Sequence, residues 1–125
     1  MSETLSMHQE FIKKLATILD RNLENEKFGV AELATEIGLS RSQLHRKLQE
    51  INGKSSSQFI REYRLEKAMK MLEANEATVS EVAYRVGFSS PSYFSRSFNN
   101  FYGHPPGEVK YQKSTAPPKK TFSKK

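Results

Sequence analysis

Apolar residues recur every three or four positions along most of the chain, and this spacing predicts helices rather than strands. The first such run lies between about residues 7 and 24, where Phe11, Leu15 and Ile18 fall on one face. No long stretch alternates apolar and polar residues, and no Asn-Gly turn joins two β-branched runs. The pattern therefore predicts an all-α fold.

Start and stop signals divide the rest of the chain into further helices. Start signals occur at Gly29, Ser40, Ser55, Thr78 and Ser90. Glu or Gln stands three residues after the first four, as in a capping box, and proline directly follows the fifth. Stop signals are the glycines Gly38, Gly53, Gly87 and Gly103. These signals predict seven helices, at about 7–24, 30–37, 41–51, 56–74, 79–86, 91–101 and 105–111.

One part of the chain occurs twice. The segment from Ala34 to Ser40 (ATEIGLS) matches the segment from Ala83 to Ser89 (AYRVGFS), and LHRKLQEING (44–53) matches FSRSFNNFYG (94–103) after a one-residue insertion. A small residue where two helices cross, followed by glycine at the turn, is typical of a helix–turn–helix. We therefore predict two helix–turn–helix subdomains, at 7–54 and 76–111, joined by a linker helix at 55–75. Residues 112–125 are predicted to form a disordered basic tail.

The last helix of each copy carries an apolar stripe. Leu44, Leu48 and Ile51 share one face of the helix at 41–51. Their counterparts on the helix at 91–101 are Phe94, Phe98 and Phe101. We predict that both stripes belong to the core.

The opposite side of the same two helices carries polar stripes. They consist of Ser42, His45, Arg46 and Gln49 in the first copy and Ser92, Ser95, Arg96 and Asn99 in the second. A solvated face is the ordinary explanation of polar residues on a helix. Such a face usually mixes glutamate with lysine, whereas neither stripe contains an acid and arginine falls at the same place in both. The stripes therefore favour recognition helices that enter the major groove of DNA.

The residue types suit contacts to DNA. Arginine can bond to guanine O6 and N7 at once, amides suit adenine, and hydroxyls accept several pairings. Helix N-termini and nearby positive charge can hold phosphates. The candidates for phosphate contact in the sequence are Ser40, Arg41, Lys47, Lys54 and Ser90.

The linker helix can supply the spacing between two recognition helices. About 18 residues at ~1.5 Å each span roughly 27 Å, and successive major-groove faces lie ~34 Å apart. One chain could thus place both helices on one side of a duplex, with some bending of the DNA. The apolar residues of the linker cover a wide arc, as expected if it packs against both subdomains; they are Phe59, Ile60, Tyr63, Leu65, Ala68, Met69 and Leu72. Its predicted solvated, ion-paired face consists of Arg61, Arg64, Lys67 and Lys70.

Three segments resemble the DNA-binding domain of AraC/XylS-type bacterial transcription regulators. They are YFSRSFNNFYGHPPGEV (93–109), FIREYRLEKAMKML (59–72) and AYRVGFSSPSYFSR (83–96), and the resemblance covers about residues 8–111. It implies two helix–turn–helix subdomains that bind adjacent major grooves to control transcription. The base-contacting residues that it implies are Ser42, His45, Arg46, Ser92, Ser95 and Arg96. Gln49 and Asn99 lie further along the helices and are weaker candidates for base or backbone contacts.

The chain departs from the family pattern in the second copy. Asn99 and Asn100 stand where many relatives carry two lysines, so the phosphate contact implied at Asn100 is expected to be weak and the first unit to dominate affinity. Val109 and Lys110 replace the usual closing tyrosine and arginine. The segment GLSRSQLHRKLQEINGKSSSQFI (38–60) also resembles output domains fused to sensor kinases or receiver domains. That resemblance implies a sensor or receiver domain outside this chain, and RNA polymerase as a partner.

Charge and composition add little that is specific. The net charge of +6 arises entirely from residues 110–125, which hold six lysines and no acid, so the remaining residues are formally neutral. Since the chain has no cysteine, it cannot form disulfides or thiolate metal sites. It has no apolar run of about 18 residues and no signal-peptide pattern. We expect a cytoplasmic protein without membrane contact, cofactor or metal.

Two other functions compete with DNA binding. Enzymatic activity is disfavoured, because His8, His45 and His104 are scattered without metal spacing or a nucleophile–base pair, and alkyl-group repair on this fold uses a cysteine. A protein-interaction module would need Phe88, Tyr93 and Tyr102 as a docking surface, although core or turn positions suit these aromatics better. RNA binding would need exposed aromatic stacking platforms, which the sequence does not show.

Overall fold

The computed structural model describes residues 2–109, and every regular element in this range is helical. The α-helices are α1 (Ser2–Arg21), α2 (Val30–Ile37), α3 (Arg41–Asn52), α4 (Ser56–Glu73), α5 (Val79–Arg85) and α6 (Pro91–Tyr102), followed by a short 3-10 helix at Pro106–Glu108. The predicted all-α class and helix order are confirmed. The predicted tail at 112–125 and the last residues of the seventh predicted helix lie outside the described residues.

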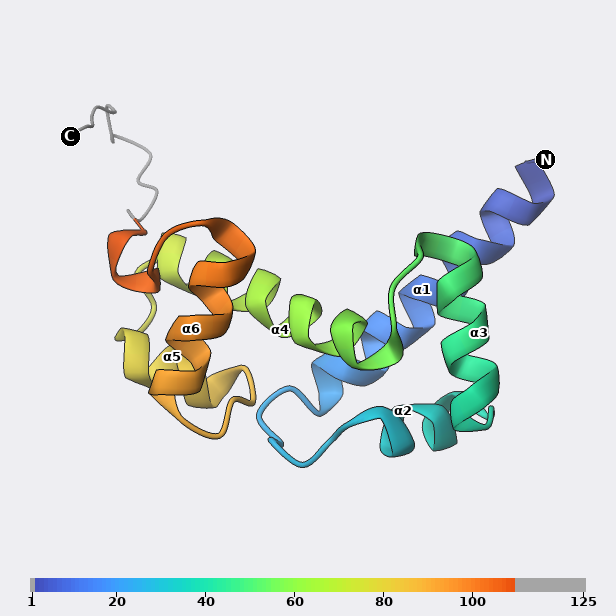
Figure 1. Cartoon of the computed structure of the whole chain (residues 1–125), viewed down its shortest axis with the longest axis horizontal. Coiled ribbons are helices and arrows are strands. Elements are labelled where there is room, and N and C mark those ends of the chain that lie inside the picture. The colour runs from blue at the N-terminus through green and yellow to red at the C-terminus, as the bar shows by residue number, and fades with distance from the viewer. Residues whose placement is uncertain (1, 110–125) are drawn as a thin grey trace.

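Helix α4 connects two groups of helices (Figure 1). We call α1, α2 and α3 the first unit, and α5 and α6 with the 3-10 helix the second unit. Helix α4 contacts α2 and α3 on one side of the molecule and α5 and α6 on the other. As a result, α3 and α6 stand near opposite ends of α4.

Each unit has its own hydrophobic core, and α4 contributes to both. The first core is formed by Leu15, Ile18, Leu19, Phe28, Leu33, Ala34, Leu44, Leu48, Phe59 and Ile60. The second is formed by Leu65, Ala68, Leu72, Val82, Ala83, Val86, Phe88, Phe94 and Phe98. Phe59 and Ile60 in the first half of α4 therefore pack in one core, while Leu65, Ala68 and Leu72 pack in the other. The wide apolar arc predicted for this helix is confirmed.

The two helix–turn–helix segments have the same turn. The Leu39 amide donates to the Ala34 carbonyl at 2.9 Å, and the Phe88 amide donates to the Ala83 carbonyl at the same distance. Ala34 and Ala83 are both buried, which lets the helices before and after the turn cross closely. Gly38 and Gly87 have positive φ angles of 84° and 90°, which glycine adopts without steric cost. The sequence repeat is therefore a structural repeat.

Side-chain caps begin the helices as predicted. The hydroxyls of Ser40, Ser55 and Thr78 each accept a hydrogen bond from the amide three residues on. In the reciprocal bond of a capping box, the Gln or Glu side-chain oxygen accepts from the backbone amide of the cap residue, and this bond forms at Ser40 and Thr78. The box predicted at Ser55 is not complete, because the Gln58 amide group donates to Glu62 at 2.9 Å. Gly29 and Ser90 also stand at helix starts.

Phe101 is an exception to the predicted core stripes. The stripe of Phe94, Phe98 and Phe101 is predicted to be buried, and the first two side chains have no exposed surface. The prediction is wrong for Phe101, which is 38% exposed. A helical stripe can continue three or four residues on, and here Tyr102 packs against Phe98 with ring centroids 4.7 Å apart. That leaves Phe101 at the edge of α6.

Arg64 is a second exception. The pattern places it on a solvated face of α4, but only 6% of the residue is exposed. The prediction is wrong because the guanidinium reaches four backbone carbonyls between the two units, and these replace water around the charge. Lys67 follows the prediction, since its ammonium lies 3.3 Å from the Asp20 carboxylate.

Candidate nucleic-acid interface

Helix α3 presents its polar stripe to solvent because Leu44 and Leu48 are held in the first core, whereas Ile51, predicted with them, is only half-buried and lies outside that core. Leu44 and Leu48 have no exposed surface. The residues on the other side of the helix are exposed, and they are the predicted set of Ser42, His45, Arg46 and Gln49. Packing of the leucines thus determines which side chains a ligand can reach.

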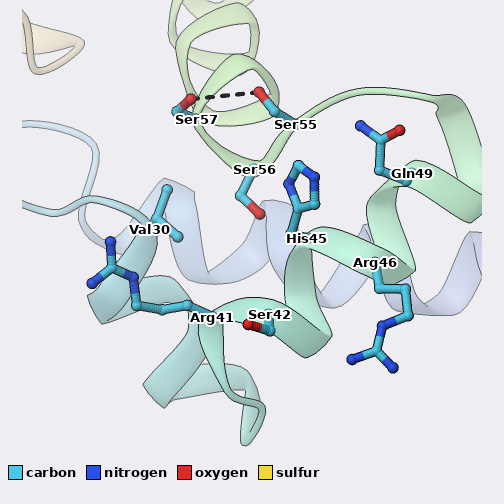
Figure 2. A pocket seen from close by; sticks show the side chains of 9 residues that line it. All are labelled: Val30, Arg41, Ser42, His45, Arg46, Gln49, Ser55, Ser56 and Ser57. Carbon is cyan, nitrogen blue, oxygen red and sulfur yellow. Dashed lines mark hydrogen bonds between the residues drawn. The ribbon is translucent and has the colours of Figure 1, made fainter.

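These four side chains line an open hollow between α3 and the start of α4 (Figure 2). The other lining residues are Val30, Arg41, Ser55, Ser56 and Ser57. His45 and Gln49 lie toward the serines, whereas the guanidinium groups of Arg41 and Arg46 point to opposite sides. The hollow therefore combines two flexible cations with hydroxyl and amide groups, which can contact both the edges and the backbone of a nucleic acid.

Three serines at the start of α4 are members of this hollow that the sequence analysis missed. Ser55 was recognised only as a helix cap, and Ser56 and Ser57 carry no spacing signal of their own. Ser55 and Ser57 lie within 3.4 Å of each other through their hydroxyls. Their position in the sequence could have identified them. They follow α3 directly, and a short connection brings the start of α4 beside that helix.

Helix α6 is arranged in the same way in the second unit. Phe94 and Phe98 fix its buried side. On the other side Ser92, Arg96 and Asn99 are exposed, and Ser95 is half-buried. The two polar stripes thus occupy equivalent positions on equivalent helices.

The two stripe arginines have no ion-pair partner among the described residues. Within residues 2–109, no carboxylate lies within ion-pair distance of the Arg46 or the Arg96 guanidinium. Elsewhere in that range Arg21, Lys54 and Lys67 each contact a carboxylate. Unpaired arginines that share a register on two repeated helices are available for an external anion or base edge.

Two of the predicted phosphate contacts already have partners within the chain. The Lys47 ammonium lies over the Phe11 ring, 5.5 Å from its centroid, and so turns toward α1. The Lys54 ammonium contacts the Glu62 carboxylate at 2.6 Å. Burial opposes ionisation of Glu62, but hydrogen bonds from Lys54 and Gln58 lower the pKa of its carboxyl below the ordinary value. These lysines would have to leave their partners to reach a phosphate.

The helix N-termini offer different numbers of backbone donors. The Ser40 and Ser90 hydroxyls accept from the amides of Gln43 and Tyr93, both at 3.1 Å, and are therefore engaged in capping. The amides in the first turn of a helix have no partner within the helix. Helix α3 can offer the backbone amides of its first two residues. Helix α6 begins with Pro91, which has no N–H, and so offers one amide fewer. Arg41 on α3 and Asn100 on α6 are exposed.

The three aromatic residues of the competing docking surface are not exposed together. Phe88 is buried and Tyr102 packs beside Phe98, so these residues do not form an exposed docking surface with Tyr93. Within residues 2–109 there is no cluster of side chains that could hold a metal ion. In the same range, no helix has the length and apolar character needed to cross a bilayer.

Comparison with known proteins identifies the family. Residues 33–112 match the family described as "Helix-turn-helix domain". A crystal structure of an AraC-type transcriptional regulator from Chromobacterium violaceum superimposes with a TM-score of 0.74, at 26% identity, over 84% of this chain and 93% of that one. The chain belongs to the AraC-type helix–turn–helix family. The sequence resemblance is therefore confirmed.

Two further relatives bear on the function of this AraC-type domain. The DNA-binding domain of AdpA, solved in complex with a target DNA, has a TM-score of 0.67 at 27% identity and covers 80% of this chain and 86% of that one. A protein named "Histidine kinase P4" from Formosa agariphila is 35% identical over 103 residues, which are 82% of this chain. The chain spans only 8% of the length of that relative. The family is that of the DNA-binding helix–turn–helix domains of transcription regulators.

Proposed function

We propose that the chain binds double-stranded DNA in a sequence-specific manner to regulate transcription, with α3 and α6 in adjacent major grooves. One observation carries the proposal. Two equivalent recognition helices each expose a stripe without acids. An arginine that has no ion-pair partner among residues 2–109, Arg46 or Arg96, falls at the same register in both. A solvated face has no need for such repetition.

The residues of the stripes have distinct roles in the proposed complex. Arg46 and Arg96 would each bond to a guanine through O6 and N7. Ser42, His45, Ser92 and Ser95 are the further base contacts, because they lie in the N-terminal half of a recognition helix, which reaches furthest into the groove. Gln49 and Asn99 lie one turn further along and would contact a base or the backbone.

Phosphates would be held around these stripes rather than within them. The residues concerned are exposed or half-exposed on the recognition helices or at their starts; they are Ser40, Arg41, Ser90 and Asn100. The amides of the first turn of α3 add donors that do not depend on side chains. Lys47 and Lys54 would add positive charge near the first unit, and direct contact would require them to leave Phe11 and Glu62.

The length of α4 suits two successive major grooves. It has 18 residues, which at ~1.5 Å each make roughly 27 Å. The grooves on one side of a duplex lie ~34 Å apart. The recognition helices project from the two ends of α4, which supports simultaneous contact with modest bending of the DNA.

We also propose partners outside this chain. A regulator of this family would act on RNA polymerase in the bacterial cytoplasm, where the chromosome is. The match to a short part of a protein named as a histidine kinase supports a sensor or receiver domain as the source of the signal.

Selection from random duplex DNA tests the proposed function. Binding of the selected sequence should be measured at two salt concentrations, because phosphate contacts release counterions and make affinity fall steeply with salt. We expect two short enriched blocks about one helical turn apart. A single block would mean that only one helix reads bases, and no enrichment would contradict the proposal.

A further inference from the structure

Arg64 lies where the two units meet, and its guanidinium joins them. Nη1 donates to the carbonyl of Leu23 at 2.8 Å and to that of Val86 at 2.7 Å. Nη2 donates to the carbonyls of Asn25 and Phe28, at 3.2 and 2.9 Å. One side chain from α4 therefore holds four backbone groups at once.

The four carbonyls come from segments that place the two recognition helices. Leu23, Asn25 and Phe28 belong to the connection between α1 and α2 in the first unit. Val86 is the residue directly after α5, at the turn that leads to α6 in the second unit. Figure 1 shows these two connections meeting beside the middle of α4. The guanidinium thus relates the turn of the second unit directly to the backbone of the first.

The chemistry of arginine makes this contact geometrically demanding. The guanidinium is planar and its N–H groups point in fixed directions. Carbonyls that accept from both terminal nitrogens must therefore lie along those directions, near the plane of the group. The charge is buried without a carboxylate within ion-pair distance among residues 2–109. Since burial without such a partner is unfavourable, the group tolerates little loss of these bonds. Lysine, a point charge on a flexible stem, does not impose the same arrangement.

Gly87 shows that the space around the guanidinium is closed from the side of the second unit. A Cβ atom at Gly87 would collide with the Arg64 guanidinium and with the Leu23 carbonyl. The glycine also has a positive φ of 90°, which other residues rarely adopt. The backbone of the second turn is therefore packed directly on the arginine, with no side chain between them.

We propose that Arg64 is a positioning residue that fixes the separation and rotation between α3 and α6. It thereby sets the spacing between the two DNA blocks that the chain accepts. The part of the proposal that concerns spacing rests on the proposed function. The part that concerns the relative position of the helices does not, and it can be tested without DNA.

The first test measures the arrangement of the units directly. Because the chain has no cysteine, Glu50→Cys on α3 and Ser80→Cys on α5 can carry two spin labels at exposed positions. Electron resonance distance measurements on the full chain should give a narrow distribution for the parent and a broad or displaced one for Arg64→Lys and Arg64→Met. Lys70→Met, an exposed position on the same helix, is the matched control and should leave the distribution narrow.

The second test measures the consequence for binding, on DNA in which the two selected blocks are separated by varied numbers of base pairs. The parent should prefer one spacing. In Arg64→Lys, affinity for a single block should stay unchanged, while affinity for two blocks at the preferred spacing should fall by about tenfold or more, because loosely coupled units lose effective concentration. At spacings that the parent binds weakly, Arg64→Lys should lose little affinity. The dependence of affinity on spacing should therefore be flatter for the variant than for the parent.

The outcomes separate the two proposals. If the parent shows no preferred DNA, the proposed function fails, and the label distances alone decide the role of Arg64. If Arg64→Lys retains the helical content of the parent and also its narrow distance distribution, Arg64 only stabilises the fold and the positioning role is overturned. Arg64→Lys retains the charge, so it keeps the test available if Arg64→Met does not fold.

Discussion

Arg46 and Arg96 are exposed on α3 and α6, whereas Arg64 is buried beneath the junction of the two units. The sequence alone treats all three as polar helix positions. The repeat separates the first two from the third, because only Arg46 and Arg96 recur at one register. The burial of Arg64 follows instead from backbone carbonyls contributed by distant segments, which no local pattern encodes.

The stripe arginines give the first prediction. Arg46→Ala and Arg96→Ala should each weaken binding to the selected DNA by roughly 1–3 kcal/mol and relax specificity only in the block that the altered helix reads. Arg21→Ala is the control, since it removes the same charge from an exposed position on α1. Titration of each variant on DNA with single changes in either block checks the result. If both stripe variants bind as tightly as the parent, the stripes are solvated faces.

The contact between Gly87 and Arg64 gives a second prediction at the same scale. Gly87→Ala should destabilise the fold more than Gly38→Ala, although both glycines have positive φ. At Gly38 a Cβ meets nothing within 4 Å, so the cost is the left-handed conformation alone, ~1–2 kcal/mol. At Gly87 the Cβ also displaces the guanidinium, which should add ~1–3 kcal/mol. Urea unfolding of the two variants measures the difference, and equal free energies of unfolding would contradict a closed space around Arg64.

At the scale of elements, most boundaries follow from short-range chemistry that is visible in the sequence. Helix α5 begins at the capping box of Thr78, and α6 begins at the proline after Ser90, as expected. Both could be predicted because a cap depends on residues within one turn. The choice between Phe101 and Tyr102 for the core depends on what lies opposite α6, and the sequence could not decide it. The serines at the start of α4 entered the candidate site for a similar reason, through the packing of α4 on α3.

The contact between α1 and α4 yields a prediction on pH. Tyr63 on α4 donates its hydroxyl to the Asp20 carboxylate at 2.6 Å. Burial raises the pKa of Tyr63, and so do the hydrogen bond and the charge of Asp20. The phenol is therefore held neutral in the folded state. Its contribution to stability should be complete below the ordinary tyrosine pKa of about 10 and should decline as the pH rises above that value.

Tyr63→Phe tests this coupling. At neutral pH the variant should be less stable by about 1 kcal/mol, because it lacks the hydrogen bond to Asp20. Above about pH 10 its free energy of unfolding should fall less steeply than that of the parent, since one raised tyrosine pKa is gone. Urea unfolding at a series of pH values gives both quantities. Parallel pH profiles would show that Tyr63 does not link α1 and α4 in this way.

At the scale of the whole molecule, the two helix–turn–helix segments share their turn but differ in charge. Helix α3 carries Arg41, Arg46 and Lys47, whereas the only basic residue of α6 is Arg96. Helix α6 also lacks one first-turn amide because it begins with Pro91. Phosphate contacts depend on such charges and donors, so the first unit is expected to contribute more of the affinity and the second unit to act mainly in choosing the site.

Asn100→Lys should reduce this asymmetry. Asn100 is exposed on α6, and a lysine there adds a cation beside the proposed path of the DNA backbone. Binding should become tighter for selected and unrelated DNA alike, and the slope of log affinity against log salt should steepen by about one. Gln9→Lys adds the same charge at an exposed position on α1 and should change the slope much less. The test measures the affinity of both variants over a range of salt concentrations. Equal slopes would mean that α6 does not lie against DNA phosphates. The second recognition helix would then have to be sought on another face of the second unit.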